Sequence, residues 1–155
     1  MVDLGLMWKM ALTIVIPLLS GCSDVKDERF ATWTDARQAG AIERGWIPPF
    51  VPASARDISD THNLDTNEQM LTFIVPPEAV KPMLESITPR TELKGAAAIK
   101  AFAAVEWNES AAKEAEAILL CTRTNSGGLV ANHRTGEAVY VSPVEWAREH
   151  CTRPH

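Results

Sequence analysis

The chain has 155 residues and a formal net charge of −5, and its composition is 46% hydrophobic and 23% charged. This composition is typical of one folded globular domain and excludes a collagen-like, coiled-coil or largely disordered chain. The negative charge argues against a general affinity for nucleic acid, and three cysteines are too few for a miniprotein built on disulfides.

The N-terminal segment has the order of a secretory signal. Residues 11–19 form an uncharged apolar run that follows Lys9, and small residues come directly before Cys22. The run is shorter than the roughly 20 residues that a membrane-spanning helix needs. Four successive residues, Leu19-Ser20-Gly21-Cys22, resemble the lipobox of bacterial lipoproteins. This resemblance implies cleavage before Cys22 and acylation of its thiol.

The same resemblance divides the chain into a signal peptide (residues 1–21), a polar tether (22–28) and one domain (29–155). It implies that acyl chains on Cys22 attach the protein to a membrane, and two or more chains make such attachment stable. We therefore expect a lipid-anchored protein of the cell envelope that faces the periplasm. Ser23 rather than Asp after the cysteine favours the outer membrane over the inner one. The alternative is an uncleaved anchor helix with an incidental cysteine.

The first part of the domain predicts a brief strand at residues 30–33 and a helix over 36–44. Asp35 is the expected N-cap, with Gln38 as its capping-box partner. Prolines within residues 46–52 exclude a helix or a central strand, so we expect an extended aromatic segment over the body. The aromatic residues are expected in the core or along a groove for a sugar: Trp33, Trp46, Phe50, Trp107 and Trp146.

The middle of the chain predicts a hairpin of strands at residues 55–62 and 69–75. The second strand is apolar on both faces, which favours a central position. Helices are expected over three later segments: 78–87, 96–106 and 109–116.

The C-terminal third predicts a strand at 118–121, a turn at 125–128, and a hairpin of 129–133 with 137–141. Ser142 is the expected N-cap of a helix over 143–150. Together these elements predict an α+β fold, an antiparallel sheet of about five short strands with a few short helices against it. No internal repeat is evident in the sequence.

The two cysteines of the domain, Cys121 and Cys151, form an even pair in a chain that we expect in an oxidising compartment. The predicted last helix would present Cys151 toward the sheet that carries Cys121, which favours a disulfide. The alternatives are two free buried thiols, or a reactive or metal-binding site with His133 or His150. Paired metal-ligand spacing is missing, so we expect no metal and no cofactor.

The densest polar cluster of the sequence lies in residues 57–68. Asp60 and His62 are expected on one strand face, where a carboxylate and an imidazole can form an acid–base pair. The oxygens of the cluster suit Ca²⁺, but the spacing is not that of an EF-hand. A solvated turn whose side chains bond to the local backbone is the third interpretation. The candidate ligand or partner contacts are Asp57, Asp60, His62, Asp65, Asn67 and Glu68.

A wider resemblance covers most of the domain. The segments 45–49, 52–58, 62–68, 127–131 and 135–140 resemble a set of small bacterial proteins without an assigned activity. The resemblance implies a compact domain and no particular chemistry.

The sequence therefore predicts a lipid-anchored envelope protein that is a non-enzymatic binding or scaffolding module, with an envelope protein as a possible partner. One alternative is an immunity- or inhibitor-type lipoprotein that blocks a wall-degrading enzyme through an acidic, aromatic surface. Another is a small hydrolase that uses Asp60 and His62.

Overall fold

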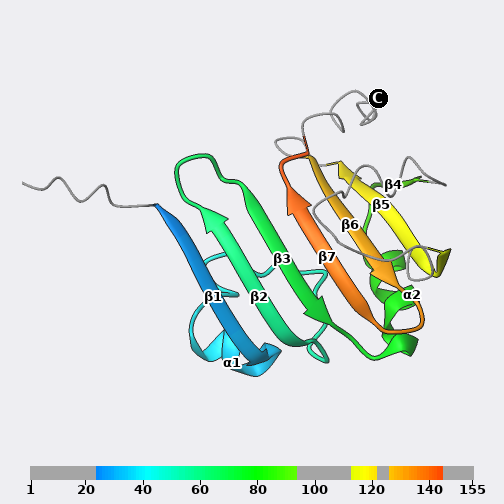
Figure 1. Ribbon diagram of the computed structural model, residues 1–155, viewed down its shortest axis with the longest axis horizontal. Helices are drawn as coiled ribbons and strands as arrows, with labels where there is room; N and C mark the ends of the chain where they lie inside the picture. Colours follow the sequence, from blue (N-terminus) through cyan, green and yellow to red (C-terminus); the bar gives the residue numbers. More distant parts are fainter. Residues whose placement is uncertain (1–23, 94–112, 122–125, 145–155) are drawn as a thin grey trace, which may run out of the picture.

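The computed structural model describes residues 24–93, 113–121 and 126–144. They form one seven-stranded sheet in the order β1-β2-β3-β7-β6-β5-β4 (Figure 1), and all neighbouring strands are antiparallel. The strands are β1 (Val25–Thr32), β2 (Arg56–Asn63), β3 (Gln69–Ile74), β4 (Arg90–Leu93), β5 (Ala115–Cys121), β6 (Ser126–Asn132) and β7 (Glu137–Ser142). The helices are α1 (Trp33–Gln38) and α2 (Pro77–Ser86). Strands β1 and β4 are therefore the two edges of the sheet.

The predicted α+β fold with about five strands is wrong. The described residues are mostly β, with seven strands and two short helices. Strand β4 was not expected, because its four residues show no apolar alternation. The turn expected at 125–128 is wrong at residues 126–128, which belong to β6, and the helix expected over 109–116 is wrong at residues 115–116, which belong to β5.

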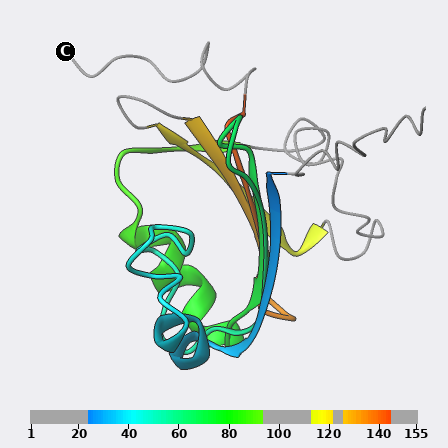
Figure 2. The same ribbon diagram turned by 90° about the vertical axis from the view of Figure 1, so that its left-hand side faces the viewer.

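Both helices and the connection 39–55 lie on the concave side of the curved sheet, which we call the inner face (Figure 2). The main core lies between them, because inner-face side chains of the strands and apolar side chains of α2 pack together. Its buried members include Ile58, Phe73, Leu84, Ile118 and Leu129. A smaller apolar group lies on the outer face of β5–β7, so β6 is buried on both faces.

Local side-chain contacts explain where α1 begins. The hydroxyl of Thr32 accepts a hydrogen bond from the backbone N–H of Asp35, and the carboxylate of Asp35 accepts one from the backbone N–H of Thr32. Thr32 is thus the N-cap and Asp35 the third helical residue, so α1 begins three residues before the predicted helix 36–44.

The two predicted hairpins are confirmed as β2–β3 and β6–β7, and β3 is a central strand as expected. The expected helix 78–87 is confirmed as α2, and neither described helix has the length and apolarity needed to cross a bilayer. Pro143 and Val144 are not helical, which contradicts the start of the predicted helix 143–150. The expected signal peptide, the helix over 96–106 and the rest of helix 143–150 lie outside the described residues.

The structure contains a repeat that the sequence does not reveal. Strands β1-β2-β3 (the first unit) and β5-β6-β7 (the second unit) pair in the same registers. Their turns are also alike, because Asn63 and Asn132 each accept hydrogen bonds from the backbone N–H groups two and three residues further on. In the first unit, the backbone N–H of Leu64 donates a hydrogen bond to the carbonyl of Asp24. In the second unit, the backbone N–H of His133 donates the equivalent bond to the carbonyl of Glu114.

The two units meet where β3 pairs with β7, around the pair of Leu71 and Tyr140. Leu71 also pairs with Asp60 of its own unit, and Tyr140 pairs with Leu129 of its own unit. The β3–β7 register is symmetric about this pair, so a pseudo-twofold axis passes through it. The expectation of no internal repeat is therefore wrong at the level of structure.

The units differ in the connection between their first two strands. In the first unit this connection consists of residues 33–55, whereas in the second unit it consists only of residues 122–125. Helix α1 and the segment that follows it are thus additions that belong to the first unit alone.

Candidate functional site

Residues 46–50, which we call the strap, cross the inner face above β2, β3 and β7. At one end, the ring of Trp46 packs against His62 with 5.8 Å between ring centroids. At the other end, Phe50 meets Tyr140 edge to face at 5.3 Å. Ile47 between them is buried in the main core. The prediction of an aromatic segment laid over the body is confirmed, but the segment is not extended. It consists of bends and a turn in which the backbone N–H of Val51 donates to the carbonyl of Pro48.

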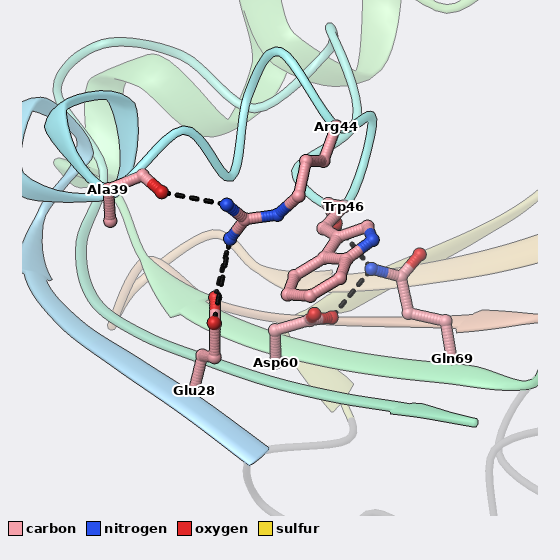
Figure 3. Close-up of polar contacts among 6 residues, drawn as sticks. All are labelled: Glu28, Ala39, Arg44, Trp46, Asp60 and Gln69. Atoms are coloured by element: carbon pink, nitrogen blue, oxygen red, sulfur yellow. Dashed lines mark hydrogen bonds and ion pairs between the residues drawn. The ribbon is translucent and has the colours of Figure 1, made fainter. Parts of the chain in front are cut away.

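A polar contact, which we call the latch, fastens the Trp46 end of the strap to the sheet (Figure 3). The side-chain amide of Gln69 donates one hydrogen bond to the backbone carbonyl of Trp46 and another to Oδ1 of Asp60, 2.6 Å away. An amide nitrogen carries two hydrogens, so it can serve both acceptors. Asp60 is only 1% exposed. The latch thus links a buried carboxyl group to the strap backbone.

The guanidinium group of Arg44 lies over the indole ring of Trp46. The guanidinium carbon of Arg44 lies 4.0 Å from the centroid of the indole ring. Arg44 is held there by Glu28, whose carboxylate lies 3.1 Å from Nη2, and by the carbonyl of Ala39, 2.8 Å from Nη1 (Figure 3). Glu28 is the cross-strand partner of Asp60. The indole therefore lies between a guanidinium group and the latch.

Two buried side-chain atoms of the described chain lack a hydrogen-bond partner, Oδ2 of Asp60 and Nδ1 of His62. Burial raises the pKa of Asp60 above its ordinary value. The hydrogen bond from Gln69 and the nearby His62 act in the opposite direction, whereas the carboxylates of Glu28 and Asp27 raise this pKa further. Asp60 therefore takes up a proton more readily than an exposed aspartate does.

The second unit provides a control for these polar side chains within the same molecule. Register equivalence places Leu129 where the first unit has Asp60, Ala131 where it has His62, and Ala138 where it has Gln69. All three residues of the second unit are buried parts of the main core. The fold thus accepts apolar side chains at these positions. Asp60 is buried and His62 and Gln69 are half-buried, so a polar group beneath the strap is a feature of the first unit alone.

A cavity of about 480 Å³, which we call the strap pocket, opens beside the Phe50 end of the strap. None of the described residues that line it carries a charged side chain. Burial raises the pKa of Tyr140, although a hydrogen bond with Ser142 opposes the shift, so this phenol stays neutral. The lining consists of Pro48, Pro49 and Phe50 of the strap, residues 86–89, and Leu120, Cys121, Gly127 and Tyr140 of the second unit.

A second hollow, of about 620 Å³, lies near β4 and the β6–β7 turn. Four of its titratable side chains form two pairs on the surface. His133 lies 3.0 Å from Glu116, and Arg134 pairs with Glu114. Two of its acidic side chains are thus engaged by neighbouring side chains, whereas the strap pocket is lined by uncharged and aromatic side chains, so the strap pocket is the better candidate for a site that binds an uncharged ligand.

The structure brings together only part of the predicted polar cluster. Asp60 and His62 share the inner face, as predicted from their spacing. Asp57 instead lies exposed and pairs with Arg56 at 2.7 Å. The remaining members, Asp65, Asn67 and Glu68, lie exposed in the β2–β3 turn.

Local contacts in that turn match the solvated-turn interpretation. The side chain of Asn63 accepts bonds from backbone N–H groups, and Thr66 bonds to the backbone and side chain of Glu68. Sequence reasoning missed Gln69, Arg44 and the latching role of Trp46. The available signal was Gln69 itself, a polar residue at the start of a strand predicted to be central.

The structure describes one of the three cysteines of the chain, Cys121. Cys121, the last residue of β5, is disulfide-bonded. Cys22 and Cys151 lie outside the described residues, so acylation of the first and pairing of the second with Cys121 stay predictions. Within the described parts of the chain, no three His, Cys, Asp or Glu side chains are grouped as metal ligands.

Comparison with known families gives one finding. Residues 24–74 match the YbbD head domain, a bacterial family. The match spans β1, α1, the strap, β2 and β3, so it covers the first unit and stops before the second. The comparison with curated proteins finds no match, and neither does the comparison with solved structures.

Proposed function

We propose that this protein is a lipid-anchored component of the bacterial cell envelope, and that its domain is a non-enzymatic binding module. The strap pocket is the observation that carries the binding role. Its volume is about 480 Å³, within the range of pockets that hold small molecules. Since the described lining is aromatic, proline-rich and uncharged, we propose a small uncharged ligand with an apolar ring.

The position of Asp60 and His62 supports binding over hydrolysis. A general acid or base must come within hydrogen-bond reach of its substrate. Asp60 is 1% exposed and one of its oxygens is held by Gln69. Neither Asp60 nor His62 lines the strap pocket.

The inhibitor alternative gains no support from the described surface. It requires exposed aromatic side chains, but the exposed large hydrophobic residues of the described chain are aliphatic or methionine: Val25, Leu64 and Met70. The described aromatic side chains are buried or half-buried. Trp107 and Trp146 lie outside the described residues.

The lipid anchor rests on the lipobox and is tested by labelling. Cells that express the full chain should incorporate radiolabelled palmitate into it, and the protein should fractionate with membranes. Cys22→Ser should abolish both results, because it removes the acylated thiol. Ser23→Ala is the matched control and should preserve both. Unchanged fractionation of Cys22→Ser would exclude the anchor.

The strap pocket is tested with 2-naphthol, an uncharged aromatic probe, on the full chain carrying Cys22→Ser. Calorimetry should show binding, and Ser86→Arg should weaken it at least roughly tenfold, because the long side chain at the exposed rim would obstruct the pocket. Ser54→Arg places the same side chain on an exposed loop outside the pocket and should leave the affinity unchanged. Equal binding by the two variants would show that the probe site lies elsewhere.

A further inference from the structure

We propose that Asp60 acts through Gln69 as a positioning residue for the strap, and that uptake of a proton by its carboxyl group loosens the strap and thereby regulates the strap pocket. The effect on the pocket rests on the function proposed above. The coupling between Asp60 and the strap does not, because it follows from the latch alone.

The latch is built so that protonation weakens it. Gln69 donates to Oδ1 of Asp60, whereas Oδ2 has no partner and is therefore the oxygen open to a proton. A hydrogen bond to a charged carboxylate is roughly twice as strong as one to a neutral acceptor. Protonation at Oδ2 thus weakens the bond that positions the Gln69 amide. The same amide nitrogen holds the carbonyl of Trp46.

The strap connects this bond to the pocket. Trp46 lies at its latched end, while Pro48, Pro49 and Phe50 form a wall of the strap pocket. Ile47 between them is buried in the core, so the two ends do not move independently. A change in the position of Trp46 is therefore transmitted to the pocket wall.

Burial is the main cause of the raised pKa of Asp60, and the charged groups around it act in both directions. On its own strand Asp60 neighbours His62, which is two residues along the same face. On β3 its neighbours are the uncharged Gln69 and Leu71. In α1, Asp35 bonds to Thr32 and Arg37 pairs with Glu43. On β1, Glu28 is the cross-strand partner of Asp60 and Lys26 that of His62, while Asp27 lies on the opposite face and bonds to Thr61. Arg44 precedes the strap and lies over the ring of Trp46.

Two effects of protonation must be separated in any test. Proton uptake removes a buried charge, which favours the folded state as a whole, and this is why burial raises the pKa of Asp60. The same event weakens the local bond to Gln69. A measurement of global stability reports the first effect, so the latch must be read at the strap itself.

The indole ¹⁵N–¹H resonance of Trp46, assigned with Trp46→Phe, reads the strap directly. In the full chain carrying Cys22→Ser, we expect one pH-dependent step with a midpoint above the ordinary aspartate value. Asp60→Asn should abolish the step and hold the resonance near its low-pH position, because asparagine stays neutral. Asp57→Asn is the matched control on the same strand, exposed and outside the latch, and should keep the step.

Further variants separate the latch from its surroundings. His62→Gln removes the imidazole next to Trp46 and should keep a step, because the step belongs to Asp60. Gln69→Ala installs the residue found at the equivalent position of the second unit. It should remove the step while the domain stays folded. A step that persists in Asp60→Asn or Gln69→Ala, or that disappears in His62→Gln, would overturn the proposal.

The effect on the pocket is measured with 2-naphthol across the same pH range. The dissociation constant should change at least about threefold in the parent chain and stay constant in Asp60→Asn. If the probe does not bind at any pH, the pocket function fails while the Trp46 step still tests the latch. If the probe binds with no pH dependence, the pocket stands and its regulation by Asp60 is excluded.

Discussion

Gly127 shows how closely single residues are matched at the pocket. A Cβ atom at this position would lie 2.6 Å from Cε2 of Tyr140, closer than real contacts allow. Gly127→Ala should therefore displace the phenol ring and lower the free energy of unfolding by about 1–3 kcal/mol. Urea denaturation measures the change.

The Tyr140→Leu background provides the control for this prediction. Leucine is the residue at the equivalent position of the first unit, Leu71. With the phenol ring removed, Gly127→Ala should lower the free energy of unfolding much less, since the two sites are in contact. An equal cost in both backgrounds would mean that the alanine is excluded for another reason.

Residue spacing predicted the face shared by Asp60 and His62, because side chains two residues apart on a strand point to the same side. It could not predict their partners. Gln69 reaches the site through strand pairing, and Trp46 reaches it through a connection whose course depends on the whole inner face.

The capping box of α1 is the clearest case of a local contact that sets an element boundary. Thr32→Ala removes the hydroxyl that caps the helix, and should reduce the free energy of unfolding by about 1 kcal/mol. Thermal or chemical denaturation measures the loss. Thr34→Ala is the matched control, because Thr34 lies exposed within α1. A loss as large in the control as in Thr32→Ala would contradict the capping role.

Elements with local signals were predictable from the sequence. Alternating apolar residues and turn chemistry predicted β2–β3 and β6–β7. Two glycines suggested a turn at residues 126–128, but these residues are strand because they pair with β5. Gly127 leaves room for the ring of Tyr140. Strand β4 had no signal of its own, since it exists by pairing with β5.

At the scale of the whole molecule, the second unit supplies a set of substitutions that the fold already accepts. The triple variant Asp60→Leu, His62→Ala, Gln69→Ala gives the first unit the residues of the second. It should be more stable near neutral pH by about 1–3 kcal/mol, because it removes buried polar atoms that lack partners.

The pH dependence of this variant has a defined sign. The pKa of Asp60 is raised by folding, so the folded state binds the proton more tightly than the unfolded state. The stability of the parent chain therefore falls as pH rises from the ordinary aspartate range through the raised pKa. The triple variant should lack this fall. Unfolding curves at several pH values, with Asp57→Asn as the control, would contradict this if all three chains behaved alike.

The repeat could not be found in the sequence because the units share little beyond their turns. Asn63, Thr66 and Glu68 recur as Asn132, Thr135 and Glu137, while most strand residues differ. The connections 33–55 and 122–125 also differ in length, so no single sequence offset aligns all three strands of one unit with those of the other. Equivalent positions became visible only through strand registers, which depend on long-range pairing.

Strand β1 is an edge strand of the sheet and begins three residues after Cys22. An edge strand carries unpaired backbone N–H and C=O groups, which can pair with the edge strand of another molecule and lead to aggregation. This edge strand carries four successive charged residues: Lys26, Asp27, Glu28 and Arg29. Charged side chains on an edge strand discourage such pairing. The run of charges therefore disfavours pairing of β1 with an edge strand of a second molecule.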